Sequence, residues 1–225
     1  MSVPVEIVRN ARARRAKLSV DPASGRVRLT LPTRAPVKSA LLWAEGQQAW
    51  IAAQQARLPR PRPFTPGGTV PFGDVELLIE WREGGSRRIV REGGILRCGG
   101  PRDGLARRIE SWLKREALRV LSAETAEFAA RAGVGVTKVA IGDPRARWGS
   151  CASTGAIRYS WRLILAPDFV RRATVAHEVA HRIHMNHGAE FHALVKRLDE
   201  NDPARSSAWL RANGTALHWI GRDYS

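Results

Sequence analysis

The chain has 225 residues, 44% of them hydrophobic, and a formal net charge of +16. It is therefore long enough to bury a sizeable core and too apolar for a disordered segment. No run of about eighteen apolar residues occurs, which excludes an ordinary membrane-spanning helix. The two cysteines, Cys98 and Cys151, exclude a disulfide framework and a thiolate zinc knuckle. We expect a cytoplasmic protein with one large domain or two small ones.

The positive charge is concentrated toward the N-terminus. Residues 1–63 hold 12 Lys and Arg against 3 Asp and Glu, whereas residues 64–225 hold 25 against 18. A basic N-terminal region suggests a polyanionic partner such as nucleic acid. The alternative is an arginine-rich composition in which Arg replaces Lys on ordinary surfaces. No membrane partner is expected, and the sequence leaves the oligomeric state open.

The N-terminal region begins with a predicted β-hairpin. Apolar and polar residues alternate over 16–31 on both sides of the turn signal "DPASG". Residues 36–57 have apolar residues at helical spacing and Pro36 in the first turn, which predicts one helix, with Gly46 as a weak point. The Pro/Gly-rich segment 58–68 is a predicted loop or linker.

Three short strand-like segments follow, at 75–81, 87–91 and 94–98, separated by "EGGS" and "EGG". Their order and short connections predict a β-meander. The first hundred residues therefore predict a small antiparallel sheet that carries one helix.

The C-terminal region alternates between helices and a short sheet. The predicted elements are a long helix at 103–131, a strand at 136–141, a hairpin over 147–165 with its turn at 153–155, a helix opened by Pro167, and helices at 188–199 and 203–214.

The helix opened by Pro167 contains the pattern H-E-x-x-H as His177, Glu178 and His181. A step of four residues on a helix is about 40° of rotation and about 6 Å of rise, so both imidazoles can reach one ion. Glu178 points to the rim of that face, where it can touch a metal-bound water. This is the arrangement of zincin hydrolases. The alternative, surface histidines paired with water, explains the clustering less well, and the small residues at 173, 176 and 180 leave room for an ion.

The third ligand must be chosen from His184, His187, His192 and Glu190. His184 shares the helix face but lies about 10 Å along the axis from His177. His187 follows Asn186, which tolerates the left-handed conformation that ends helices, and precedes Gly188, which allows a sharp turn. This arrangement favours His187.

Zinc with three protein ligands keeps a fourth position for water. In this interpretation Glu178 takes the proton of the attacking water and passes it to the leaving group. Candidate donors to the oxyanion are Arg147, Ser150 and the backbone N–H groups of 148–151.

Four motifs, "RWGSC" (147–151), "WRLILAP" (161–167), "HEVAH" (177–181) and "MNHGAEF" (185–191), resemble the YgjP-like metal-dependent hydrolase family, a zincin-like group. The long helix before them and the N-terminal hairpin also fit, so the resemblance covers nearly the whole chain.

The resemblance implies zinc held by His177, His181 and His187, with Glu178 as the catalytic base. It also implies a relationship to SprT-like proteases, some of which act on proteins attached to DNA. Together with the predicted elements it gives an α+β fold, in which an N-terminal β region (1–100) precedes a zincin-like catalytic domain (101–225) with an active-site helix.

Three nearby residues have two interpretations each. The family often has Trp where this chain has His192, which we expect to be structural or solvated. Cys151 is either a redox-active thiol beside the metal or a small packing residue, and we favour packing. Trp148 is more readily a packing anchor than a platform for substrate.

The leading function is a zinc metallopeptidase acting on a peptide or protein. An alternative keeps the metal and hydrolyses a nucleotide phosphoanhydride, with Arg147, Arg158 and Arg162 as phosphate clamps. A third possibility is a nucleic-acid-binding protein with a structural metal, although structural zinc usually has four protein ligands.

Overall fold

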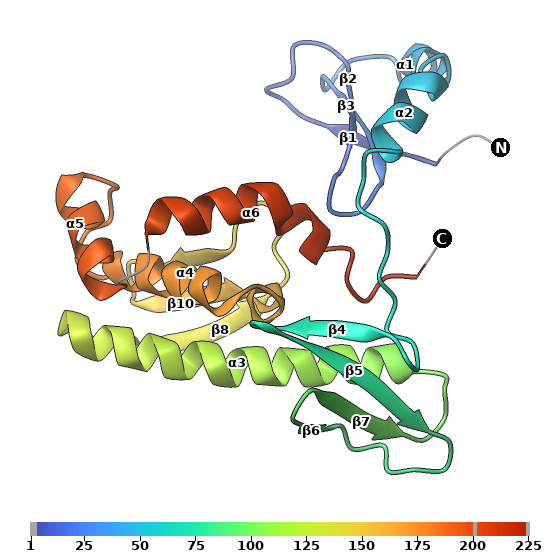
Figure 1. Ribbon diagram of the computed structural model, residues 1–225. Coiled ribbons are helices and arrows are strands. Elements are labelled where there is room, and N and C mark those ends of the chain that lie inside the picture. Colours follow the sequence, from blue (N-terminus) through green and yellow to red (C-terminus); the bar gives the residue numbers. More distant parts are fainter. Residues whose placement is uncertain (1–3, 200–201, 224–225) are drawn as a thin grey trace. The chain divides into compact units, whose positions relative to one another are not determined.

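The structure is a computed structural model that describes residues 4–199 and 202–223 (Figure 1). The chain divides into two compact units, Met1–Arg60 and Pro61–Ser225. Each has its own hydrophobic core, one within residues 5–44 and the other within residues 64–220. None of the helices in the described ranges combines the length and apolar character that a membrane span requires.

The first unit contains the predicted hairpin. Strands β2 (Lys17–Val20) and β3 (Val27–Leu31) pair antiparallel, which confirms it. A further strand, β1 (Val5–Arg9), pairs with β3 in parallel, so β3 lies in the middle of the sheet. The central position of β3 agrees with the burial of its side chains, because Val27, Leu29 and Leu31 are fully buried.

The single helix predicted over 36–57 is wrong, because the structure has two. Helix α1 (Val37–Glu45) ends at Gly46, and α2 (Gln48–Gln55) begins after Gln47. Glycine loses more backbone entropy in a helix than any other residue, and Gln47 leaves the helical region with φ −98° and ψ 17°. The apolar spacing continued across this break and concealed it.

The second unit begins with a four-stranded sheet of β4 (Thr69–Phe72), β5 (Val75–Arg82), β6 (Val90–Glu92) and β7 (Ile95–Gly99). The predicted meander is wrong. The strand order is β4-β5-β7-β6, with β5 and β7 parallel. All three residues of β6 are exposed, whereas β7 buries Leu96 and Cys98. The apolar strand therefore takes the central position, and the polar strand the edge.

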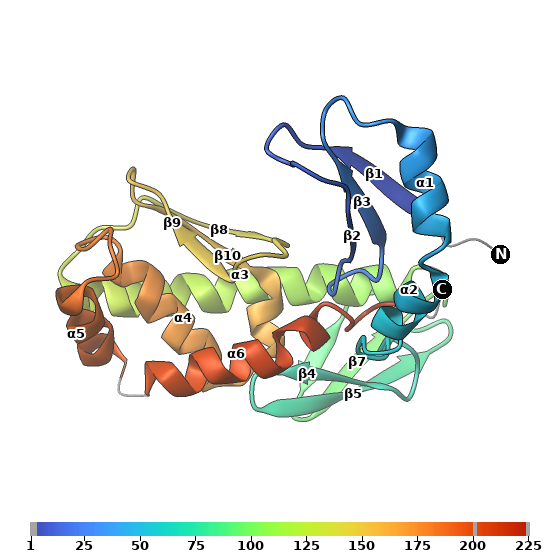
Figure 2. The ribbon, with the colours of Figure 1, turned by 90° about the horizontal axis from the view of Figure 1, so that it is seen from above.

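Helix α3 (Leu105–Ala132) is the long helix predicted at 103–131. With 28 residues it is about 42 Å long. It contacts α4, α5, β8 and the 3-10 helix η1, and its buried residues share one core with the β4–β7 sheet. Figure 1 shows α3 running below the segments that follow it in the chain, and Figure 2, seen from above, shows it passing behind α4 (Asp168–Ala180).

A short sheet follows, made of β8 (Lys138–Gly142), β9 (Gly149–Cys151) and β10 (Ala156–Ser160) in the order β8-β10-β9. The antiparallel β9–β10 pair confirms the predicted hairpin. Beyond Ser160 the chain forms η1 (Trp161–Leu165) instead of continuing the strand to 165. The Ser160 hydroxyl caps this turn by accepting from the Arg162 N–H.

Three helices complete the unit, α4 (Asp168–Ala180), α5 (Ala189–Leu198) and α6 (Pro203–Leu217). Gly214 does not end the last helix as predicted. A Cβ at this position would lie 2.8 Å from Cζ2 of Trp148, so the glycine allows the indole to pack closely against α6. Packing, not chain termination, accounts for this glycine.

The α+β fold class predicted from the sequence is confirmed. The candidate site residues all follow residue 100, in the region predicted to be catalytic. The domain boundary at residue 100 stays a prediction. The hydrophobic core of the second unit includes residues on both sides of it, from Phe64 onward.

Candidate metal centre

Three histidines from the predicted site come together. His177 lies in the last turn of α4, His181 is the residue that caps this helix, and His187 lies between α4 and α5. One ring nitrogen from each lies within 4.8 Å of those of the other two. The Nε2 atoms of His177 and His187 are 3.2 Å apart. Among the described residues, this is the group of His, Cys, Asp and Glu side chains that could hold a metal ion.

The chain reverses after α4 by a different route from the one predicted. The helix stops at Ala180, and a turn over 181–183 follows directly. No described non-glycine residue has a positive φ, so a left-handed Asn186 is excluded. Gly188 is extended, with φ −74° and ψ −179°. His184 is therefore off the helix, and the earlier turn, not a reversal at 186–188, returns His187 to the cluster.

Two contacts orient the imidazoles. Nδ1 of His181 lies 3.0 Å from the backbone oxygen of His184. When Nδ1 donates this bond, Nε2 carries a free lone pair, as a metal ligand requires. The buried ring of Phe191 packs against all three imidazoles, with centroid distances of 4.9, 4.6 and 4.8 Å to His177, His181 and His187.

The protonation of His177 also suits a ligand. Burial, together with the neighbouring histidines, lowers its pKa from 6.5 to about 4. The imidazole is therefore neutral at pH 7, which is the form that binds a metal. Three imidazole nitrogens from one cluster make a donor set that fits zinc.

The other candidate ligands lie outside the cluster. His184 faces Glu190, with 3.7 Å between Nδ1 and Oε2, and the Glu190 side chain is 86% exposed. His192 is exposed, and its ring centroid is 6.4 Å from that of His187. His192 is thus solvated, as expected from the sequence.

Glu178 is buried beside the cluster. Its burial raises the pKa from 4.5 to about 7, although the positive charge of Arg147 acts in the opposite direction. The carboxyl lies against the backbone of β9, where a Cβ on Gly149 would be 2.4 Å from Oε1 and 2.6 Å from Cγ. The absence of a side chain at Gly149 therefore makes the space that Glu178 occupies.

A cleft of about 290 Å³ opens beside His177 and Glu178. Its walls come from α4, α5, the N-terminal half of α6, and the segment that leads into β9. The polar side chains that line it include Arg147, Thr174, Ser206 and Ser207, and the apolar ones Trp148, Val195 and Leu210. The cleft therefore reaches one imidazole of the cluster, that of His177, and the carboxyl group of Glu178.

Two features of this site were not predicted from the sequence: the space that Gly149 leaves for Glu178, and the contact of Phe191 with the imidazoles. A glycine in a short strand signals close approach by another group, so Gly149 carried a readable signal. Phe191 carried none, because an apolar residue on a helix ordinarily packs in the core. Of the predicted oxyanion donors, Arg147 and the Gly149 backbone line the cleft, whereas Ser150 lines a neighbouring hollow of about 290 Å³.

Arg162 is occupied by structural contacts. Its guanidinium donates to both carboxylate oxygens of Asp143, at 2.8 and 3.1 Å, and to the backbone oxygens of Leu217 and Ile220. It therefore fastens the end of α6 to the loop after β8. Arg147 and Arg158 are exposed and line the neighbouring hollow together with Ser150.

Trp148 and Cys151 both have packing roles. The indole contacts Gly214 and the ring of His218, with a centroid distance of 5.5 Å to the latter. Cys151 packs against the core, and burial raises the pKa of its thiol despite the charge of Arg182. A thiol with a raised pKa is a poor nucleophile and a poor redox group at neutral pH.

A family model described as YgjP-like, metallopeptidase domain, matches residues 14–213. Neither curated proteins nor solved structures gave a match.

Proposed function

Because the chain belongs to the YgjP-like metallopeptidase family, we propose that it is a zinc-dependent peptidase with His177, His181 and His187 as ligands. The observation that carries this proposal is the convergence of three imidazole nitrogens beside the buried carboxyl group of Glu178. When bound, zinc would supply Lewis acidity, which lowers the pKa of water and polarises a peptide carbonyl.

Glu178 is the proposed general base. A base must take a proton from water and hold it until the leaving amine departs, so a carboxyl group with a pKa close to neutral is suited to both steps. The Gly149 backbone fixes the carboxyl at the cleft, and the Arg147 guanidinium lies close enough to affect its charge. Arg147 is then available to orient the substrate carbonyl.

A peptide substrate suits the cleft because β9 is an edge strand. The sheet order β8-β10-β9 leaves one side of β9 without a partner strand in the described ranges. An extended peptide could add to this edge by backbone hydrogen bonds, which would carry its scissile bond past Glu178.

The test combines metal analysis with turnover. The purified chain should contain about one zinc per molecule and should cleave an unfolded protein such as casein. Glu178→Gln should keep the zinc and lose at least about 100-fold in kcat. A variant that keeps wild-type turnover would rule out Glu178 as the base, and a chain that takes up no zinc on reconstitution would rule out the metal site.

A phosphoanhydride hydrolase is the second candidate, favoured by Arg147 and Arg158 in the hollow beside Gly149. Two observations weaken this second candidate. Arg162 already donates to Asp143, and the Asp143 carboxylate also lines the hollow, where its negative charge would repel a phosphate. Nucleoside triphosphates assayed beside casein separate the two functions. A structural metal is disfavoured because the described part of the chain offers three ligands and no fourth.

We also propose that the chain works in the cytoplasm. Cys98 is buried and Cys151 half-buried, and both are free thiols, as is usual in a reducing compartment.

A further inference from the structure

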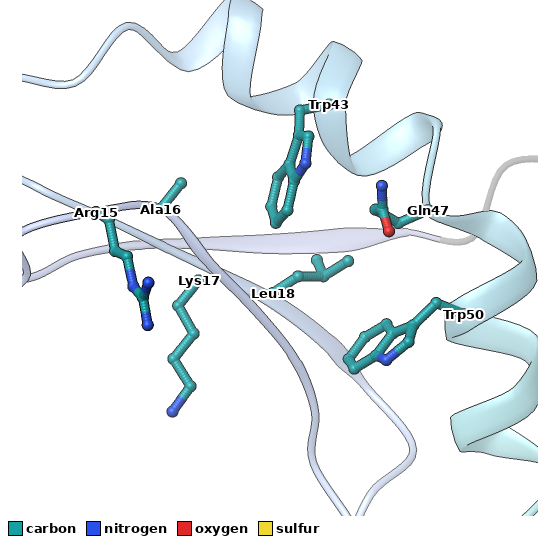
Figure 3. A pocket seen from close by; sticks show the side chains of 7 residues that line it. All are labelled: Arg15, Ala16, Lys17, Leu18, Trp43, Gln47 and Trp50. Carbon is teal, nitrogen blue, oxygen red and sulfur yellow. The ribbon is translucent and has the colours of Figure 1, made fainter.

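The first unit contains a hollow that the proposed peptidase does not use. It has a volume of about 490 Å³, within the range of roughly 300–1,000 Å³ typical of ligand sites. Figure 3 shows the indoles of Trp43 and Trp50 reaching from α1 and α2 toward Leu18 on β2, while Arg15 and Lys17 extend from the strand side. All of these residues belong to the same compact unit.

The two indoles do not serve the core of this unit. Trp43 is 45% exposed and Trp50 is 39% exposed. Neither belongs to the core cluster formed around Leu29, Leu31 and Ala44. Large aromatic side chains held at the surface around a hollow commonly mark a binding site.

The charge of the unit is strongly one-sided. Residues 1–60 hold 11 Lys and Arg against 3 Asp and Glu. Within the described part of the chain Arg15 and Lys17 form no ion pair, while Glu6, one of the three acids, pairs with Arg28. The rim of the hollow is therefore positive and its charges are available to an anion.

We propose that this hollow binds single-stranded nucleic acid, with bases stacked on Trp43 and Trp50 and phosphates held by Arg15 and Lys17. Flat aromatic rings accept any base, and cations on the adjacent strand follow the backbone. An acidic peptide would pair with Arg15 and Lys17, but it would contact the indoles only if an apolar residue lay at the matching position. Paired aromatic faces beside a basic stretch favour a polymer that repeats a base and a phosphate.

The experiment measures binding of fluorescent dT12 and rU12 oligonucleotides to the full-length Glu178→Gln chain, which removes any proteolysis. The double variant Trp43→Leu/Trp50→Leu keeps apolar packing and lacks the rings, so affinity should fall at least about tenfold. The double variant with Phe at both positions keeps the rings and should retain most of the affinity. Leu42→Ala is the matched control, since Leu42 is 61% exposed on α1 and does not line the hollow.

Salt dependence tests the basic residues separately. Arg15→Ala/Lys17→Ala should lower the slope of log K against log salt by about 0.7 for each phosphate that the variant no longer neutralises. Lys38→Ala removes an exposed charge from α1 outside the hollow and should change the slope less.

Several results would overturn the proposal. Equal affinity of the Leu double variant and the parent chain would do so, as would binding of poly-glutamate but not of oligonucleotides. A third result requires the Leu double variant with Glu178 intact. If this variant lost casein cleavage while its oligonucleotide affinity stayed the same, the hollow would serve proteolysis and not nucleic-acid binding. The oligonucleotide and poly-glutamate measurements do not depend on whether the metal site is a peptidase.

Discussion

Gly149 determines whether the carboxyl group of Glu178 can occupy its place. We expect Gly149→Ala to retain zinc and to lower kcat about 100-fold, because the new methyl group would overlap Cγ and Oε1 of Glu178. Gly135→Ala is the control, since a Cβ there meets no atom within 4 Å. Wild-type turnover of Gly149→Ala in a steady-state assay would contradict this account of the site.

Asp143 provides a pH-dependent contribution to stability. Burial raises its pKa, but the hydrogen bonds and charge of Arg162 outweigh this and hold the pKa below the ordinary 3.8. A carboxyl group with a lowered folded-state pKa stabilises the fold above its ordinary pKa, and this stability is lost as the pH falls through the folded-state value.

Asp143→Asn should therefore lower the free energy of unfolding by about 1 kcal/mol at pH 7, a value reduced for partial exposure, and have a smaller effect near pH 2. Urea unfolding at the two pH values measures the difference. Glu83→Gln, which changes an exposed carboxylate without an ion pair among described residues, should have little effect at either pH. An equal loss for Asp143→Asn at both pH values would show that shape, not charge, matters at this position.

The site could be predicted from the sequence where spacing alone determines geometry. The four-residue step from His177 to His181 brings both rings to one place, as the structure shows. The choice of His187 over His184 agrees with the cluster, but the reason differed. The position of the helix end depends on hydrogen bonds from residues 181–184 back to α4, and the sequence does not reveal these.

At the scale of elements, α5 supports the end of α4 through Phe191. Phe191→Leu would remove the flat ring that contacts three imidazoles, so we expect zinc affinity to fall about 10- to 100-fold. Leu194→Ala, also buried on α5, is the control for a general loss of packing. Chelator competition measures the affinity, and equal losses in the two variants would reduce Phe191 to an ordinary core residue.

Helices and hairpins could be predicted because periodicity and turn residues are local. Strand order could not be predicted in this way. The parallel pairing of β5 with β7 depends on β7 being more apolar than β6, and this comparison involves strands that are separated by loops. Gly46 and Gly214 also show that a local pattern does not determine where a helix ends. Gly46 interrupts a helix that the pattern continued, and Gly214 stays inside a helix that the pattern ended.

At the scale of the whole molecule, the two cores share no residue. We therefore expect a fragment of residues 61–225 to fold, to bind about one zinc and to cleave casein, while losing oligonucleotide binding. A fragment of residues 101–225 lacks Val70, Leu77 and Leu96, which belong to the same core as α3, and should not fold. Circular dichroism and zinc analysis compare the fragments, and a folded 101–225 fragment would contradict this view of the core.

The location of His187 outside any helix has a kinetic consequence. Two of the proposed ligands belong to a helix and its cap, but the third lies on an exposed segment between α4 and α5. A zinc ion bound as proposed would therefore be released when that segment alone opens, long before the core unfolds. Transfer of zinc to a chelator should then proceed at a rate that low concentrations of urea hardly change. Metal exchange and unfolding would then be separate events, and opening of the segment between α4 and α5 would control metal exchange.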